Sequence, residues 1–103
     1  MTSEGARRAE AIIFMQRALL GMVTPELRGV TIRVGENLVH SRMIYEREPS
    51  EDDRELVSEV ETEMIAAYLP EVDVAVVPDA VFPSAWPELL PDERWVYRRR
   101  EPG

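Results

Sequence analysis

Apolar and polar residues alternate at helical spacing between residues 5 and 22, which predicts a first helix there. Gly21 near its end suits a left-handed cap. Two residues depart from the pattern, because Gln16 interrupts the apolar face and Phe14 lies within the polar stripe. Phe14 is therefore a candidate for an exposed apolar residue. The face itself is expected to contain Ala9, Ile12, Ile13, Leu19, Leu20 and Val23.

A hairpin is expected after this helix. Thr24 and Pro25 resemble a helix start, so residues 25–28 are expected to form one turn that Gly29 ends. Residues 30–34 alternate as a strand does, residues 35–37 form a turn, and residues 38–47 form a second strand. Ile44 falls on the polar face of that strand and is a second candidate for exposure.

A second helix and two further strands complete the pattern. Ser50 is a good N-cap, with Asp53 as the partner in a capping box, and the helix should run from residue 51 to about 68 because Pro70 follows. Residues 72–77 and 94–99 are predicted strands, and the segment 79–92 between them is an irregular loop with three prolines and Trp86.

This order of elements predicts a two-layer α+β fold. We expect one domain over residues 1–103 in the order helix, hairpin, helix and two strands. The four strands should form an antiparallel or mixed sheet with both helices on one face.

Charge and composition narrow the possible functions. The chain has 20 acidic and 12 basic residues, one His and no Cys. Nucleic acids and anionic membranes are poor partners for so acidic a chain, because phosphates are bound by Lys and Arg. Thiol chemistry is excluded, a cofactor or metal is not expected, and the lone His40 lacks a nucleophile arrangement. The apolar stretch 9–23 is too short and polar to cross a bilayer, so a cytoplasmic location is expected.

The strongest signal is the acidic segment 46–63. It contains nine acids against two bases, and so −7 of the chain's net charge of −8. The helix spacing places Glu51, Glu55 and Glu59 away from the core, with Asp52 and Glu63 beside them. Such a row can present negative charge to a basic groove, and the alternative is an ordinary solvated helix face. A metal site is disfavoured because the ligands lie on a straight helix and do not converge.

Several segments resemble a known family of bacterial proteins. These are residues 15–21 (MQRALLG), 25–28 (PELR), 50–53 (SEDD), 61–66 (ETEMIA) and 95–99 (WVYRR), followed by Glu101. The pattern is similar to that of small immunity proteins of contact-dependent growth inhibition and colicin-type toxin systems. The resemblance implies a non-catalytic protein that binds a cognate toxin domain, often a nuclease. It also implies that Gln16 and Thr62 are fold positions that contact backbone groups at the sheet.

The resemblance and the charge lead to one hypothesis. The chain is expected to be an immunity protein, not an enzyme, that binds a basic toxin domain and is monomeric when alone. Its expected partner-binding residues are Glu48, Glu51, Asp52, Glu55, Glu59 and Glu63, with Phe14 or Trp86 as an apolar anchor. The alternative is a structural domain that associates with itself through a strand edge or Trp86.

Overall fold

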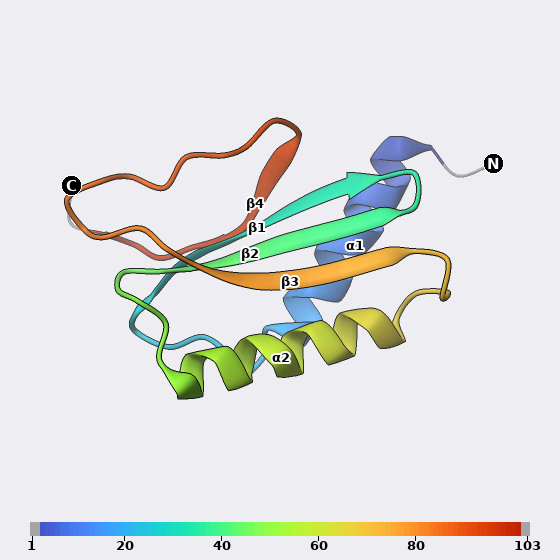
Figure 1. Ribbon diagram of the computed structural model, residues 1–103. Helices are drawn as coiled ribbons and strands as arrows, with labels where there is room; N and C mark the ends of the chain where they lie inside the picture. The colour runs from blue at the N-terminus through green and yellow to red at the C-terminus, as the bar shows by residue number, and fades with distance from the viewer. Residues whose placement is uncertain (1–2, 102–103) are drawn as a thin grey trace.

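A computed structural model describes residues 3–101, which form two helices and four strands (Figure 1). In chain order the elements are α1 (Glu4–Ala18), β1 (Leu27–Gly35), β2 (Leu38–Tyr45), α2 (Glu51–Ala66), β3 (Asp73–Ala80) and β4 (Glu93–Arg98). The strands form one sheet in the order β3-β2-β1-β4. β1 is antiparallel to β2 and β4, whereas β3 is parallel to β2.

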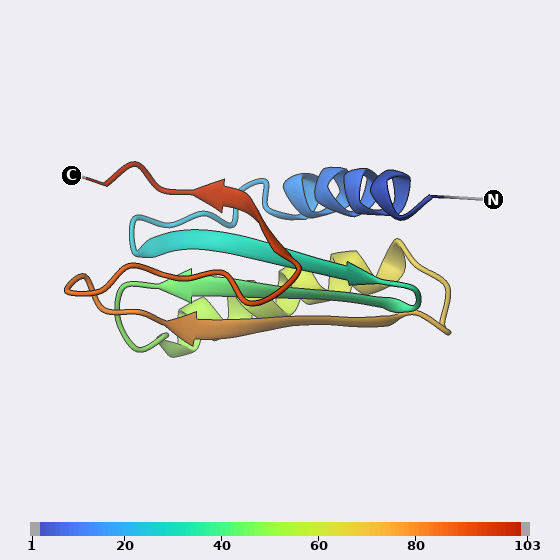
Figure 2. The same cartoon turned by 90° about the horizontal axis from the view of Figure 1, so that it is seen from above.

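The helices and the loop between β3 and β4 lie on opposite faces of this sheet. Buried residues of α1 and α2 belong to one core cluster with residues of the sheet, and Figure 2 shows residues 81–92 crossing the strands on the side opposite α2. A right-handed crossover through α2 is the usual way to join two parallel neighbouring strands. The expected α+β fold with both helices on one face of a mixed sheet is confirmed.

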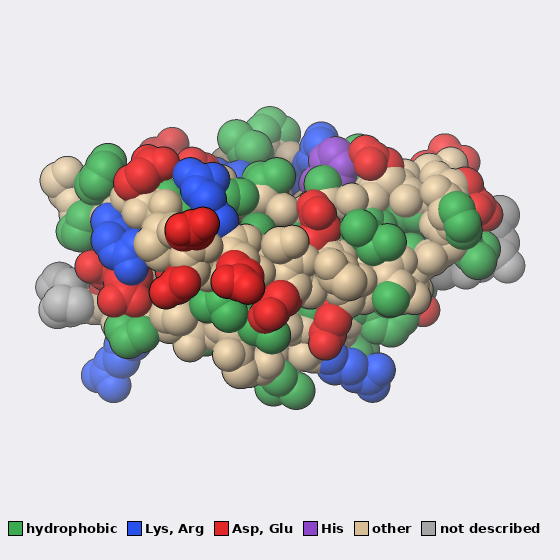
Figure 3. Space-filling model, turned by 60° about the horizontal axis from the view of Figure 1, so that its bottom comes forward, with side chains coloured by type: hydrophobic (Ala, Val, Ile, Leu, Met, Phe, Trp, Pro, Cys, Tyr) green, Lys and Arg blue, Asp and Glu red, His purple; other side chains and the backbone are tan. Residues whose placement is uncertain are grey.

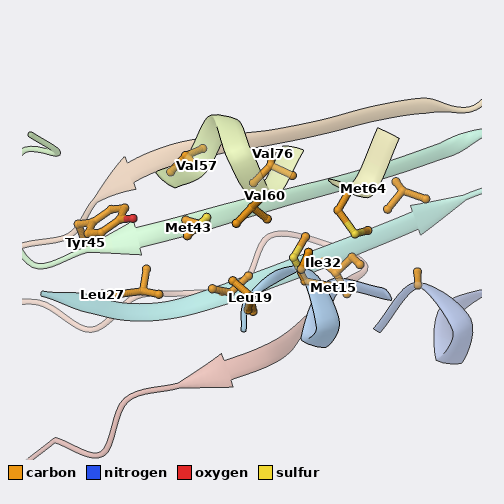
Figure 4. Packing of buried hydrophobic residues seen from close by; sticks show 14 residues of the cluster. Met15, Leu19, Leu27, Ile32, Met43, Tyr45, Val57, Val60, Met64 and Val76 are labelled. Atoms are coloured by element: carbon orange, nitrogen blue, oxygen red, sulfur yellow. The ribbon is translucent and has the colours of Figure 1, made fainter. Parts of the chain in front are cut away.

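The hydrophobic core lies between the helices and the sheet. Met15 of α1 and Val60 of α2 are fully buried against Ile32 of β1 and Met43 of β2 (Figure 4). Leu27 and Tyr45 extend the core to the end of the sheet where α2 begins. Burial of such side chains contributes about 1.5–3 kcal/mol each, so this layer provides the main stabilising term.

α2 begins with the capping box expected from the sequence. The Ser50 hydroxyl accepts a hydrogen bond from the Asp53 amide at 3.1 Å, and the Asp53 carboxylate accepts one from the Ser50 amide at 3.0 Å. Arg47 also donates to Asp53 at 2.7 Å. Burial opposes ionisation of Asp53, but the Ser50 amide and the Arg47 guanidinium outweigh it and lower its pKa. The helix start is therefore fixed by local contacts.

The expected apolar face of the first helix is confirmed only in part, because Leu19 is buried and Ile12 packs against the core, whereas Ile13, Leu20 and Val23 are exposed. α1 ends at Ala18, and its buried residues are Ala11, Met15 and Ala18. Ile13 and Gln16 are exposed. Ala11, Met15 and Ala18, which are four and three residues apart, form a narrow stripe that faces the core. The other apolar residues of α1 lie outside this stripe.

Two candidates for exposed apolar residues are also corrected. Phe14 is half-buried and packs edge-to-face on Tyr68, with the ring centroids 5.6 Å apart. Ile44 is fully buried, although it lies outside the main core cluster. It alternates with Met43 and Tyr45 and therefore faces the sheet surface that the 81–92 loop covers.

Two further expectations fail on local detail. No helical turn forms over residues 25–28, because β1 already begins at Leu27. Thr62 is exposed and donates a hydrogen bond to the Ser58 carbonyl of its own helix, so neither it nor Gln16 contacts the sheet backbone.

Candidate functional site

Five carboxylates lie along the exposed side of α2, and we call them the acidic row: Glu51, Asp52, Glu55, Glu59 and Glu63. All five are exposed, and none forms an ion pair with another residue in the range 3–101. Figure 3, in which α2 is turned toward the viewer, shows acidic side chains distributed along this side. Glu48, the remaining acid expected there, is exposed and pairs with Arg54 at 3.1 Å. The acidic row therefore has charge that the described part of the chain does not neutralise.

Part of the acidic row borders a shallow groove. Glu55, Glu59 and Glu63 line it together with Met22, which lies in the connection between α1 and β1. Ser58 and Thr62 form the rest of its lining, and its volume is about 550 Å³. The groove thus combines three carboxylates with one apolar side chain. A surface of this kind can accommodate a basic segment that also has an apolar residue.

The two proposed apolar anchors do not lie beside the acidic row. Phe14 contributes to packing against Tyr68 and is not free to act as an anchor. Trp86 is exposed as expected, but it belongs to the 81–92 loop, on the sheet face opposite α2 (Figure 2). The structure therefore separates the expected site into an acidic part and an apolar part.

The apolar part is a second surface, which we call the apolar loop surface: Val77, Phe82, Trp86, Leu89 and Leu90. All five are exposed, four in the 81–92 loop and Val77 in β3. Of these five residues, only Trp86 was predicted from the sequence as a binding residue. The three prolines of the loop indicated an ordered segment, but no sequence signal placed Val77 next to it.

Arg28 holds the first half of this loop. It is almost completely buried, and one of its terminal nitrogens, Nη1, donates to the carbonyls of Val81, Phe82 and Ala85 at 2.9, 3.2 and 2.8 Å. Its Nε and Nη2 donate to both carboxylate oxygens of Glu101 at 2.7 and 2.6 Å. This bidentate pair, aided by Arg99, lowers the pKa of Glu101 to about 2. The C-terminal segment thus fixes the arginine that orders the loop.

Glu93 and Arg42 hold the second half. The buried Glu93 carboxylate accepts hydrogen bonds from the Thr31 hydroxyl, the Leu90 amide and the Arg42 guanidinium at 2.6–2.9 Å. Arg42 also donates to the Glu88 carbonyl at 2.9 Å and to Asp79 at 3.0 Å. Burial opposes ionisation of Glu93, but the hydrogen bonds from Arg42 and Thr31 outweigh it and lower its pKa. Because both halves are fixed from the sheet, the loop presents its apolar residues in one defined arrangement.

Other chemistry has little support within the described range. His40 pairs with Asp73 at 2.9 Å on the surface, and within residues 3–101 no Ser or Thr hydroxyl is hydrogen-bonded to either side chain. Residues 3–101 contain no group of three His, Cys, Asp or Glu side chains that is placed to hold a metal ion. Neither helix in this range is long and apolar enough to cross a membrane.

Comparison with known proteins gives the family. The family model described as MafI2 immunity protein matches residues 8–101, which include all four strands, α2 and most of α1. No curated protein matches the chain. Membership of an immunity protein family implies binding to a cognate toxin protein, and such families are generally not enzymatic. With this match over most of its length, the chain belongs to the MafI2 immunity protein family.

Proposed function

We propose that this immunity protein neutralises its toxin by covering a basic surface of the toxin with the acidic row of α2. The proposal includes a cytoplasmic site of action and a non-catalytic mechanism. The observation that carries it is that five exposed carboxylates share one helix face and have no ion-pair partner within residues 3–101. The carboxylates repel one another in the free protein, and an oppositely charged surface of a partner would remove this repulsion.

The spacing of these acids makes the free helix face unfavourable. Glu55 lies four residues before Glu59, and Glu59 lies four residues before Glu63, so neighbouring carboxylates repel each other by a few tenths of a kcal/mol per pair. Lys or Arg side chains from a toxin relieve this repulsion and gain attraction at the same time. Met22, which lines the same groove as Glu55, Glu59 and Glu63, adds an apolar contact beside that charge.

The charge also determines how the two proteins meet. Oppositely charged surfaces accelerate association by about tenfold to a thousandfold at low ionic strength. Toxins that bind or cleave nucleic acids have basic substrate surfaces, because phosphates are bound by cations. We therefore assign the toxin to the class with a basic active surface, of which a nuclease is the leading example.

The experiment begins with the tagged protein purified from its own host at low and high salt, and the partner is identified by mass spectrometry. The association rate of that toxin domain is then measured by stopped-flow for the native chain and for Glu55→Lys/Glu59→Lys/Glu63→Lys. We expect the rate at low salt to fall by about tenfold or more in this variant, and its salt dependence to become weak.

A matched control distinguishes the effect of charge on α2 from the effect of the total net charge. Glu10, Glu36 and Glu71 are exposed acids outside α2 that form no ion pair within residues 3–101. Reversing these three changes the net charge equally and should leave most of the rate and its salt dependence. Equal loss in both triple variants would contradict a localised site, and no loss in either would contradict charge-driven recognition.

A further inference from the structure

The apolar loop surface has no role in the proposal above, and it contains five of the ten large apolar residues that are exposed within residues 3–101. Trp86 is 59% exposed, Phe82 58%, Leu90 53%, Val77 46% and Leu89 41%. Exposed apolar patches of several hundred Å² mark interaction sites on soluble proteins. Aromatic residues are also enriched at the centres of protein interfaces.

This surface is ordered before any partner arrives. Arg28 holds three carbonyls of the loop, and Glu93 and Arg42 hold the Leu90 amide and the Glu88 carbonyl. A partner therefore does not have to order a mobile segment, which lowers the entropic cost of binding.

The charged groups beneath the loop do not prevent a partner from covering it. Arg28 is paired with Glu101, and Arg42 with Glu93 and Asp79. Burying an unpaired charge at an interface is expensive, but these charges already have partners. Excluding water from above them therefore leaves no charge of this network without a counterpart.

A hollow beside the loop can accept an apolar side chain. Its volume is about 210 Å³, and most of its exposed lining is apolar. The apolar lining comes from Ala75, Val77 and Leu90, and the polar lining from Arg33, His40, Ser41, Arg42 and Glu93. Protruding side chains such as Trp86 and a hollow that accepts apolar groups thus occur on the same face of the molecule. A two-fold symmetric contact uses the same patch on both copies, so a protruding side chain of each copy can enter the hollow of the other.

The charges around this surface favour a second copy as the occupant. Glu88 and Asp92 are exposed on the loop, Arg33 and Arg98 are exposed on β1 and β4, and none of the four forms an ion pair within residues 3–101. A two-fold arrangement can therefore place Arg33 or Arg98 of one copy against Glu88 or Asp92 of the other. The acidic row, with most of the net charge, lies beyond the opposite face of the sheet and so does not oppose this approach (Figure 2).

We propose that a second copy of this chain covers the apolar loop surface, giving a two-fold dimer in which the sheet faces that bear the 81–92 loop meet. The two acidic rows then point away from each other, so each remains available to a toxin. This proposal goes beyond the proposed function and does not depend on it. It differs from the monomer expected from the sequence, because the sequence did not show that these five residues share a surface.

Pairing of strand edges is the competing mode of self-association, and the β3 edge is poorly suited to it. The Val76 amide donates to Glu61 of α2 at 2.9 Å, and Pro78 has no amide hydrogen. An edge strand that lacks free donors at two positions does not readily add a strand from another copy. The face of the sheet is therefore the better candidate than this edge.

Sedimentation velocity across a wide range of concentrations tests the proposal with the purified chain alone. We expect a concentration-dependent dimer for the native chain and a dissociation constant raised about tenfold or more in Trp86→Ser/Leu90→Ser. Leu20→Ser/Leu69→Ser is the matched control, because both residues are exposed leucines outside this surface. The control should dimerise like the native chain, and circular dichroism should show that both variants are folded.

Two results overturn the proposal. A native chain that remains monomeric at about 1 mM has no useful affinity for itself. A dimer that is unchanged in Trp86→Ser/Leu90→Ser has its contact elsewhere. Neither result affects the proposed function, which is tested by toxin association in the acidic-row variant, so the two proposals fail independently.

Discussion

The acidic row of α2 and the loop over the opposite sheet face are both exposed, but they are held in place in different ways. α2 is positioned by local contacts, since Ser50, Asp53 and Arg47 lie within six residues of one another. The 81–92 loop is positioned by Arg28 and Arg42, whose partners lie 37 to 73 residues away in the chain. A local charge pattern is therefore readable from sequence, whereas a surface assembled by distant side chains becomes visible only in the fold.

The difference also concerns the response to substitution. Removing an acid from the row takes away charge but no internal partner. Removing one of the residues that hold the loop leaves buried groups without partners.

Glu93→Ala should destabilise the protein by removing the carboxylate that holds the 81–92 loop. It leaves Arg42, the Thr31 hydroxyl and the Leu90 amide without their common acceptor. Loss of one member of a largely buried ion pair costs about 3–5 kcal/mol, and we expect the free energy of unfolding to fall by about 3 kcal/mol in urea denaturation. Glu55→Ala is the control, expected within about 0.5 kcal/mol of the native chain. Similar values for the two variants would show that the Glu93 network does not stabilise the loop.

Gly29→Ala should disturb the support of the loop more gently. A Cβ atom at this position would lie 2.6 Å from a ring carbon of Trp95 and 3.1 Å from the Tyr97 carbonyl oxygen. The Trp95 ring, which lines the same small cavity as Trp86, must then move. We expect a loss of about 1–3 kcal/mol, measured by thermal denaturation. Gly5→Ala, whose Cβ has no close neighbour, should be neutral or slightly stabilising, and an equal loss there would refute the steric explanation.

Acidification should weaken the Glu101 contact. Its pKa is lowered from 4.5 to about 2 by Arg28 and Arg99, so the ionised form stabilises the fold above pH 4.5. This contribution should be lost progressively as the pH falls from about 4.5 to 2. The urea midpoint of Glu101→Gln should therefore be lower than that of the native chain at pH 7 and approach it near pH 2. Parallel curves at a constant separation would contradict this assignment.

Removing one charge from the acidic row should have the smallest effect on stability, and this effect should be a gain and not a loss. Glu59 has a like charge four residues away on each side, so Glu59→Gln should raise the stability of the free protein by about 0.2–0.5 kcal/mol at low salt. The gain should shrink at high salt because screening weakens the repulsion. Thermal melts at two ionic strengths measure it, with Glu71→Gln as the control. A loss of stability on removing this charge would mean that Glu59 has a favourable partner in the free protein.

The sequence predicted most of the fold because the signals for it are local. The capping box fixed the start of α2 at residue 51, and the short turn after Gly35 fixed the hairpin. The pattern failed in α1, where the close-packed stripe of Ala11, Met15 and Ala18 leaves larger apolar residues such as Ile13 in solvent. It also failed at Ile44, because no local signal shows that a loop from residues 81–92 covers the second face of the sheet.

The candidate site was predicted only in part for the same reason. The acids of α2 follow from helix spacing alone, and the structure places all of them on the exposed side. The positions of the apolar anchors could not be predicted in this way, since Phe14 packs on Tyr68 and Trp86 belongs to the loop on the other side of the sheet. Arg28 and Glu93 appeared in the sequence as ordinary charged residues, and their roles depend on partners that only the tertiary fold supplies.

The most direct test of the acidic row is carboxyl labelling of this protein with and without its bound toxin domain, read residue by residue by mass spectrometry. The account predicts that toxin protects Glu55, Glu59 and Glu63, while Glu10, Glu36 and Glu71 are labelled as in the free chain. Protection that is absent from α2 and appears instead at Glu88 in the loop would contradict it, because the toxin would then occupy the surface assigned here to a second copy.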